Sequence, residues 1–179
     1  MKSAMLFLFL TPFSLGGGKA LAQNTAQSTS ATGNWIISET KSPVDYSPIV
    51  VGTTRSREDA EGSAMELSIC CRNGRTYLFL TGQTIISGRA DEQAISYRIN
   101  GHNPVQAGVG SALFGGIALQ GDVVSLLQSL PDEGELAIRL AARAGSSREG
   151  YFSLDGLKVV RNKLAAACKW PLTDIKPRN

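Results

Sequence analysis

The side chains best suited to catalysis, metal binding or disulfide formation in this sequence are three cysteines and a single histidine. His102 lies in segment 100–104 (NGHNP), whose composition is typical of a turn. A zinc site would need further ligands at a defined spacing, and the sequence offers none. A Ser-His-Asp triad would need a nucleophile elbow of the form G-x-S-x-G, which is absent as well. We therefore interpret His102 as an exposed turn residue and predict a non-enzymatic protein without metal or cofactor.

Paired carboxylates could perform general acid–base chemistry. They occur in two polar segments, 58–61 and 132–135, the first next to arginines and the second in a Pro/Gly turn. Mixed charges of this kind are usual on solvated loops. We interpret both segments as surface.

The first 22 residues have the pattern of a secretory signal peptide. Lys2 precedes an apolar run over 4–10, and Ala20-Leu21-Ala22 supplies the small residues that signal peptidase requires. The apolar run is too short for a membrane-spanning helix, which takes about 20 residues. The pattern predicts export to the periplasm and no stable membrane insertion after cleavage, the alternative being an uncleaved anchor.

The positive charge of the chain comes largely from this segment. Removing Lys2 and Lys19 lowers the formal net charge from +3 to +1. No run of Lys or Arg remains to bind nucleic acid or an anionic membrane surface.

A β-hairpin is the clearest local signal. Asn73-Gly74 is the preferred two-residue turn, and segments 65–72 and 75–81 flank it. The turn sets the register, so that Cys71 opposes Thr76. Alternation then predicts a core face formed by Met65, Leu67, Ile69, Cys71, Leu78 and Leu80. The opposite face carries Glu66, Ser68, Cys70, Tyr77 and Phe79.

The remaining segments predict more strands and two helices. Strands are expected at 35–37, 49–51, 94–100, 113–119 and 136–140. A short helix is expected over 122–130, and a last helix with Asp155 as its N-cap. One face of that helix carries Leu157, Val160, Leu164, Ala167 and Cys168.

These elements predict an α+β fold, mainly antiparallel β, with a C-terminal helix packed on the sheet. We expect residues 23–34 to be a flexible N-terminal segment because they hold no large apolar side chain. Residues 35–170 would form a single β-rich domain, and 171–179 a C-terminal tail.

The cysteines predict one disulfide. In an oxidising compartment bonded cysteines are the default. The hairpin register and the helical stripe place Cys71 and Cys168 on facing core surfaces, so we predict that they are joined. Cys70 would then be a buried thiol, an intermolecular bridge, or the true partner of Cys168.

Two sets of side chains could bind a partner. Tyr77 and Phe79, on the non-core face of the hairpin, would form a binding patch if exposed; alternatively, a second layer covers them. Arg98 would be either a surface charge or the organiser of a buried ion pair.

The landmarks of the chain, taken in order, resemble a known family. They are Trp35, the segment 42–47 (SPVDYS), 71–76 (CRNGRT), 95–100 (ISYRIN), and the final 167–170 (ACKW). This order is similar to that of the periplasmic, type VI secretion-associated VasI/TagO-like family, over about residues 35–170. The resemblance implies a sandwich-like domain, the Cys71–Cys168 pair, an envelope accessory role and no catalytic residues.

We therefore expect an exported accessory domain that binds an envelope or secretion-apparatus protein. The alternative is a secreted inhibitor or ligand-binding domain acting on a cell-wall hydrolase. A third hypothesis, a hydrolase that uses His102, would be supported if His102→Ala abolished an activity.

Overall fold

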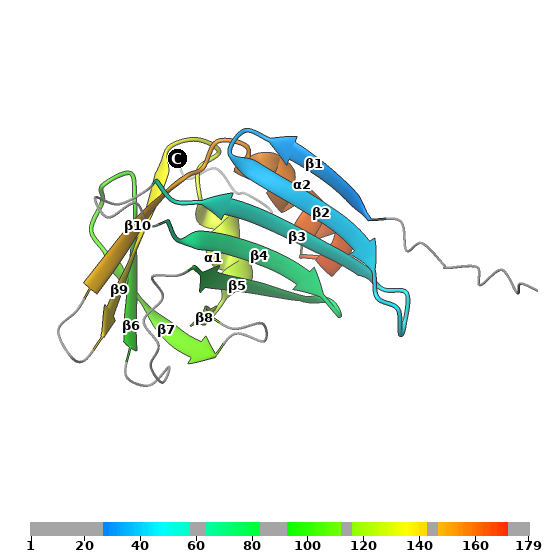
Figure 1. The fold of residues 1–179 in the computed structure, drawn as a ribbon, viewed down its shortest axis with the longest axis horizontal. Coiled ribbons are helices and arrows are strands. Elements are labelled where there is room, and N and C mark those ends of the chain that lie inside the picture. Colours follow the sequence, from blue (N-terminus) through cyan, green and yellow to red (C-terminus); the bar gives the residue numbers. More distant parts are fainter. Residues whose placement is uncertain (1–26, 58–63, 83–92, 112–115, 143–146, 172–179) are drawn as a thin grey trace, which may run out of the picture.

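The computed structural model describes residues 27–57, 64–82, 93–111, 116–142 and 147–171. The predicted signal peptide, residues 1–22, lies outside the described residues, as do residues 172–179 of the predicted tail. The described chain forms ten strands and two helices (Figure 1). The strands are β1 (Ser28–Thr32), β2 (Trp35–Lys41), β3 (Pro48–Arg55), β4 (Glu66–Arg72), β5 (Arg75–Thr81), β6 (Gln93–Ile99), β7 (Val105–Ser111), β8 (Ile117–Gln120), β9 (Glu135–Ala142) and β10 (Ser147–Ser153). The helices are α1 (Val123–Ser129) and α2 (Leu157–Cys168).

All strand pairs are antiparallel, in the order β1-β2-β3-β4-β5-β8-β7-β6-β9-β10. This confirms the expected β-rich α+β fold.

Strand β7 joins the two parts of the sheet by changing partners along its length. Its first residues, 105–107, pair with β6, and residues 108–111 pair with β8. In Figure 1, β6, β9 and β10 run at a steep angle to β1–β5. The sheet bends far enough that the backbone N–H of Arg57, just after β3, donates to the carbonyl of Tyr151 in β10 at 3.0 Å.

The hairpin around Asn73-Gly74 forms as predicted, with Cys71 opposite Thr76 and Arg72 opposite Arg75. Both turn residues have positive φ, which Asn and Gly adopt most readily. The predicted core face is confirmed, because all six of its side chains are buried: Met65, Leu67, Ile69, Cys71, Leu78 and Leu80. We call this side of β2–β5 the inner face and the opposite side the outer face.

Helix α2 covers the inner face of the sheet (Figure 1). The predicted apolar stripe is confirmed, since Leu157, Val160, Leu164 and Cys168 are buried. Asp155 is not the N-cap, which corrects the expectation. The cap is Gly156, whose φ of 93° is a conformation that glycine adopts readily. A side chain at this position would overlap the carbonyl of Thr32.

The N-terminal segment requires a second correction. Residues 28–32, which we expected to be flexible, form β1 and pair with β2 along their whole length. Strand pairing uses backbone hydrogen bonds, which small polar residues form as well as apolar ones. Gly33-Asn34 supplies the turn between the two strands.

Besides β1, two further strands were not predicted, β7 and β10. The sequence of β7 (VQAGVGS) alternates small apolar residues with Gln and two glycines, and glycine weakens the signal for a strand. That of β10 (SREGYFS) has charged residues and one glycine and lacks the alternation that marks a half-buried strand. The strand expected at 113–119 is found only from Ile117, and residues 112–115 lie outside the description.

Within the described ranges, no helix is long and apolar enough to cross a membrane.

Candidate functional site

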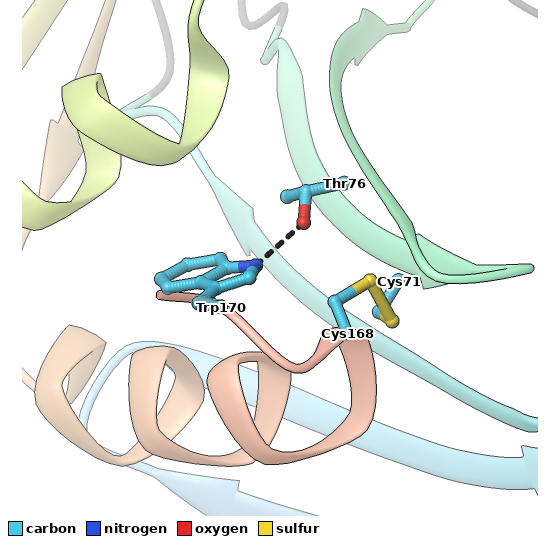
Figure 2. The surroundings of a disulfide bond; sticks show 4 residues. All are labelled: Cys71, Thr76, Cys168 and Trp170. Atoms are coloured by element: carbon cyan, nitrogen blue, oxygen red, sulfur yellow. Dashed lines mark hydrogen bonds between the residues drawn. A yellow bond between two sulfur atoms is a disulfide. The ribbon is translucent and has the colours of Figure 1, made fainter. Parts of the chain in front are cut away.

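The predicted disulfide is present between Cys71 of β4 and Cys168 at the end of α2 (Figure 2). It joins residues 97 positions apart in sequence. Next to it, the indole N–H of Trp170 donates to the Thr76 hydroxyl at 2.7 Å. Because Thr76 lies directly opposite Cys71, the end of α2 is attached to both strands of the hairpin.

Cys70 is a free thiol whose side chain lies on the outer face, between Val51 and Tyr77 of the neighbouring strands. It is only 5% exposed. Burial raises the pKa of this thiol, and Arg72 opposes part of that effect. Of the alternatives left open by the sequence, the buried thiol is the one found.

Tyr77 and Phe79 lie on the outer face, as the register predicted, and both are half-buried. The pairing of β2–β5 places further apolar side chains on the same face, among them the half-buried Val51 and the exposed Ile36. Ile36 has 54% of its surface accessible. We name these four residues, Ile36, Val51, Tyr77 and Phe79, the outer-face patch.

The centre of this patch contains small side chains. Ser68 and Cys70 of β4 lie between β3 and β5 and are buried. The hydroxyls of Thr53 and Ser68 are 3.3 Å apart, within hydrogen-bond distance. The outer face therefore combines apolar side chains from several strands with a satisfied polar pair, an arrangement suited to a protein contact.

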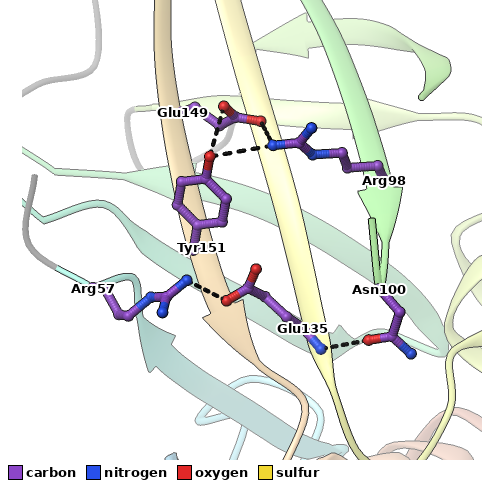
Figure 3. Close-up of polar contacts among 6 residues, drawn as sticks. All are labelled: Arg57, Arg98, Asn100, Glu135, Glu149 and Tyr151. Atoms are coloured by element: carbon purple, nitrogen blue, oxygen red, sulfur yellow. Dashed lines mark hydrogen bonds and ion pairs between the residues drawn. The ribbon is translucent and has the colours of Figure 1, made fainter. Parts of the chain in front are cut away.

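Arg98 belongs to a different surface, where it organises an ion pair (Figure 3). Its guanidinium lies 2.9 Å from a carboxylate oxygen of Glu149 and donates to the Tyr151 hydroxyl at 3.2 Å. The Tyr151 hydroxyl in turn donates to Glu149 at 3.0 Å. About 38% of the Arg98 side chain is exposed, so this ion pair is only partly buried.

A second arginine contacts the same tyrosine from the other end of the sheet. The guanidinium carbon of Arg57 is 5.2 Å from the centre of the Tyr151 ring, and that of Arg98 is 5.8 Å from it. Arg57 also pairs with Glu135 (Figure 3). Each arginine thus pairs with a carboxylate and also lies over the aromatic ring of Tyr151. We interpret this cluster as a connection between β3 and β10.

The structure does not bring the three predicted binding residues together. Tyr77 and Phe79 belong to β5 and Arg98 to β6, and β8 and β7 lie between those strands in the sheet. The partners of Arg98 were missed by sequence reasoning because Glu149 and Tyr151 lie in the unpredicted strand β10. The only local signal for this cluster was the spacing of Glu149 two positions before Tyr151, which places both on the same face of a strand.

His102 lies in an exposed turn, as predicted. Its Nδ1 lies 2.7 Å from the carbonyl oxygen of Ile99, within hydrogen-bond distance. The residue borders a groove of about 410 Å³ whose apolar lining includes Tyr97, Val105 and Pro131. Among the described residues, no group of three or more His, Cys, Asp or Glu side chains could hold a metal ion.

Comparisons with known proteins show the fold. No family model and no curated protein matches the sequence. The chain is similar in structure to invasion associated protein B from Bartonella henselae, with a TM-score of 0.52 and 15% sequence identity. The match covers 79% of this chain and 97% of that one. At this identity the likeness shows a common fold.

Proposed function

We propose that this protein is an exported, non-enzymatic interaction domain that binds an envelope protein through the outer-face patch. The observation that carries the proposal is the position of Ile36, Tyr77 and Phe79 on the sheet face opposite α2. The inner face is buried by core side chains and by α2. Covering the apolar side chains that remain accessible on the outer face with a partner is favourable, because it removes apolar surface from water.

The support beneath the patch is rigid. Strands β2–β5 are paired in continuous register, and the disulfide attaches α2 to the middle of this sheet. A surface that is already ordered before binding loses little conformational entropy when the partner docks. This favours a binding role for the face that carries the patch.

Export is the second part of the proposal. The disulfide is compatible with an oxidising compartment, and the N-terminal pattern predicts cleavage after Ala22. We expect the protein recovered from a periplasmic fraction to begin at Gln23. Recovery of a full-length chain from the cytosol would contradict this part.

We also propose that the bent sheet works as a sandwich-like shell around one core. Buried residues from both parts of the sheet belong to a single hydrophobic cluster, which includes Leu80 of β5, Ile95 of β6 and Phe152 of β10. The partner that we propose is a component of a secretion apparatus, of the type VI kind, in line with the resemblance of the landmarks. The Cys71–Cys168 bond that this resemblance implies supports the choice.

Affinity capture from envelope extract tests the proposed surface. The bait is the exported protein, and Ile36→Lys places a charge in the patch at an exposed position. Val44→Lys is the matched control, because Val44 is 88% exposed in the loop after β2. Both substitutions should change stability by less than about 0.5 kcal/mol, as is usual for surface sites.

We expect wild type and Val44→Lys to recover the same secretion-apparatus component, and Ile36→Lys to recover it at least about tenfold less well, which corresponds to about 1.4 kcal/mol. Equal recovery by all three baits would contradict the outer-face patch as the binding surface. Recovery of a cell-wall hydrolase, with loss of its activity, would favour the inhibitor hypothesis instead.

A further inference from the structure

Strand β1 forms one edge of the ten-stranded sheet and, within the described residues, pairs with β2 alone. Its sequence, STSAT, contains no charged residue, no proline and no glycine. Edge strands usually carry such features because a row of unpaired backbone N–H and C=O groups attracts a further strand. All but the last residue of β1 are exposed. As far as the structure describes the chain, this edge is therefore open to strand addition.

The turn between β1 and β2 shows which backbone groups are available. Thr32 and Trp35 flank a two-residue turn and oppose each other, so they form the hydrogen-bonded pair that closes such a hairpin. Hydrogen-bonded and non-hydrogen-bonded pairs alternate along antiparallel strands. The backbone groups of Ser30 and Thr32 thus point toward β2. Those of Thr29 and Ala31 point away from the sheet.

We propose that β1 pairs in antiparallel fashion with β1 of a second copy of this chain, with the two-fold axis between the two Ser30 residues. In this register Thr29 of each copy exchanges two hydrogen bonds with Ala31 of the other. Ser30 meets its symmetry mate in a non-hydrogen-bonded pair. The two sheets become one continuous sheet, and the contact is closed and isologous.

Charge favours a second copy in this orientation. An uncharged strand meets its own copy without like charges facing each other. Exposed Lys41 lies beyond the Ser28 end of β1, where Lys163 is already paired with Glu39. Exposed Asp155 lies at the other end, where its carbonyl accepts the N–H of Asn34. Antiparallel pairing turns the basic end of one copy toward the acidic end of the other.

A five-residue strand buries little surface, so the dimer should be weak and is best trapped covalently. Ser30→Cys in the full chain tests the register directly. Directly opposed residues of a non-hydrogen-bonded pair have Cα atoms about 4.5 Å apart, which a disulfide can bridge. Ser28→Cys is the matched control on the same side of the strand. Its symmetry mate would be about 13 Å away at 3.3 Å per residue, too far for a bond.

In a glutathione redox buffer we expect Ser30→Cys to yield at least about ten times more covalent dimer than Ser28→Cys, given these separations. Peptide mapping should show the bond between the two introduced cysteines. Equal cross-linking of the two variants would overturn the register, and no cross-linking of either would overturn the dimer.

A second pair of variants tests the hydrogen bonds without a cross-link. Ala31→Pro removes an N–H that points away from β2, whereas Ala31→Ser keeps it. By sedimentation at graded concentrations up to the millimolar range, wild type and Ala31→Ser should shift toward the dimer mass, and Ala31→Pro should stay monomeric. A wild type that stays monomeric throughout would overturn the second copy as the occupant. So would backbone amide signals of β1 that change only when a peptide of another sequence is added.

Discussion

Gly52 of β3 and Val160 of α2 lie in direct contact across the interface between sheet and helix. A Cβ added at position 52 would overlap the Cγ1 methyl of Val160. Both residues are buried, and Cys71 and Cys168 are joined further along the same interface. The absence of a side chain at Gly52 therefore sets how closely the helix can approach β3.

The first prediction follows from this contact. Gly52→Ala should lower the free energy of unfolding by about 1–3 kcal/mol, the usual range for overpacking a core. Val160→Ala should cost less in the Gly52→Ala protein than in wild type, because the shorter side chain removes the overlap. Urea denaturation of the four proteins of this cycle measures both effects. Strict additivity would show that the two side chains do not compete for the same space.

The second prediction concerns the disulfide. Cys168→Ser should lower the free energy of unfolding by about 2–5 kcal/mol, because the unfolded chain loses a cross-link between distant residues. Cys70→Ala is the matched control and should cost no more than about 1 kcal/mol, since it removes only one buried sulfur. Chemical denaturation without reductant separates the two. If Cys70→Ala proved the more damaging change, the stabilising role assigned to the bond would be wrong.

The third prediction concerns the ring of Tyr151 between two guanidinium groups. Tyr151→Phe removes the hydroxyl contacts with Arg98 and Glu149 but keeps the ring, and should cost about 0.5–1.5 kcal/mol. Tyr151→Leu also removes both cation–π contacts and should cost about 0.5–1 kcal/mol more. Thermal or urea unfolding provides the measurement. Equal losses in the two variants would mean that the ring contributes no more than an aliphatic side chain.

The fourth prediction concerns pH and the start of α1. The hydroxyl and backbone N–H of Ser125 hold the pKa of Asp122 below its usual value of 3.8. A carboxylate whose pKa is lowered by folding stabilises the protein above its unfolded-state pKa, and this contribution is lost as the pH falls through the folded-state value. Asp122→Ala should therefore destabilise the protein at neutral pH, and the difference from wild type should shrink as the pH falls below 3.8.

Asp122→Asn is the control for this pH effect. The amide oxygen can still accept the Ser125 N–H, so stability at neutral pH should stay close to that of wild type. Because the amide does not titrate, unfolding curves recorded across the acid range should lack the contribution from residue 122. A stability difference between Asp122→Ala and wild type that is independent of pH would argue against the lowered pKa.

Local patterns predicted the parts of the fold that depend on neighbours in sequence. Asn73-Gly74 defines a turn, the turn defines the register, and the register places Cys71 on the core face. Helical spacing places Cys168 on the buried side of α2 in the same way. These inferences needed only the periods of strand and helix and the conformational preference of Gly and Asn. The disulfide could be predicted because each of its ends obeys such a local rule.

Contacts between distant segments were decided by the tertiary structure. β1 forms because the backbone groups along one side of β2 are available to pair with it, although residues 28–32 have no apolar pattern of their own. Glu149 meets Arg98 only when β10 and β6 both pair with β9, and Tyr151 meets Arg57 only when the sheet bends. Local patterns predicted the hairpin, the buried stripe of α2 and Cys71–Cys168 as the preferred pairing, and the structure contains that bond. The edge strand, the Tyr151 cluster and the separation of Arg98 from Tyr77 followed from long-range pairing, because backbone hydrogen bonds between distant strands leave no period in the sequence.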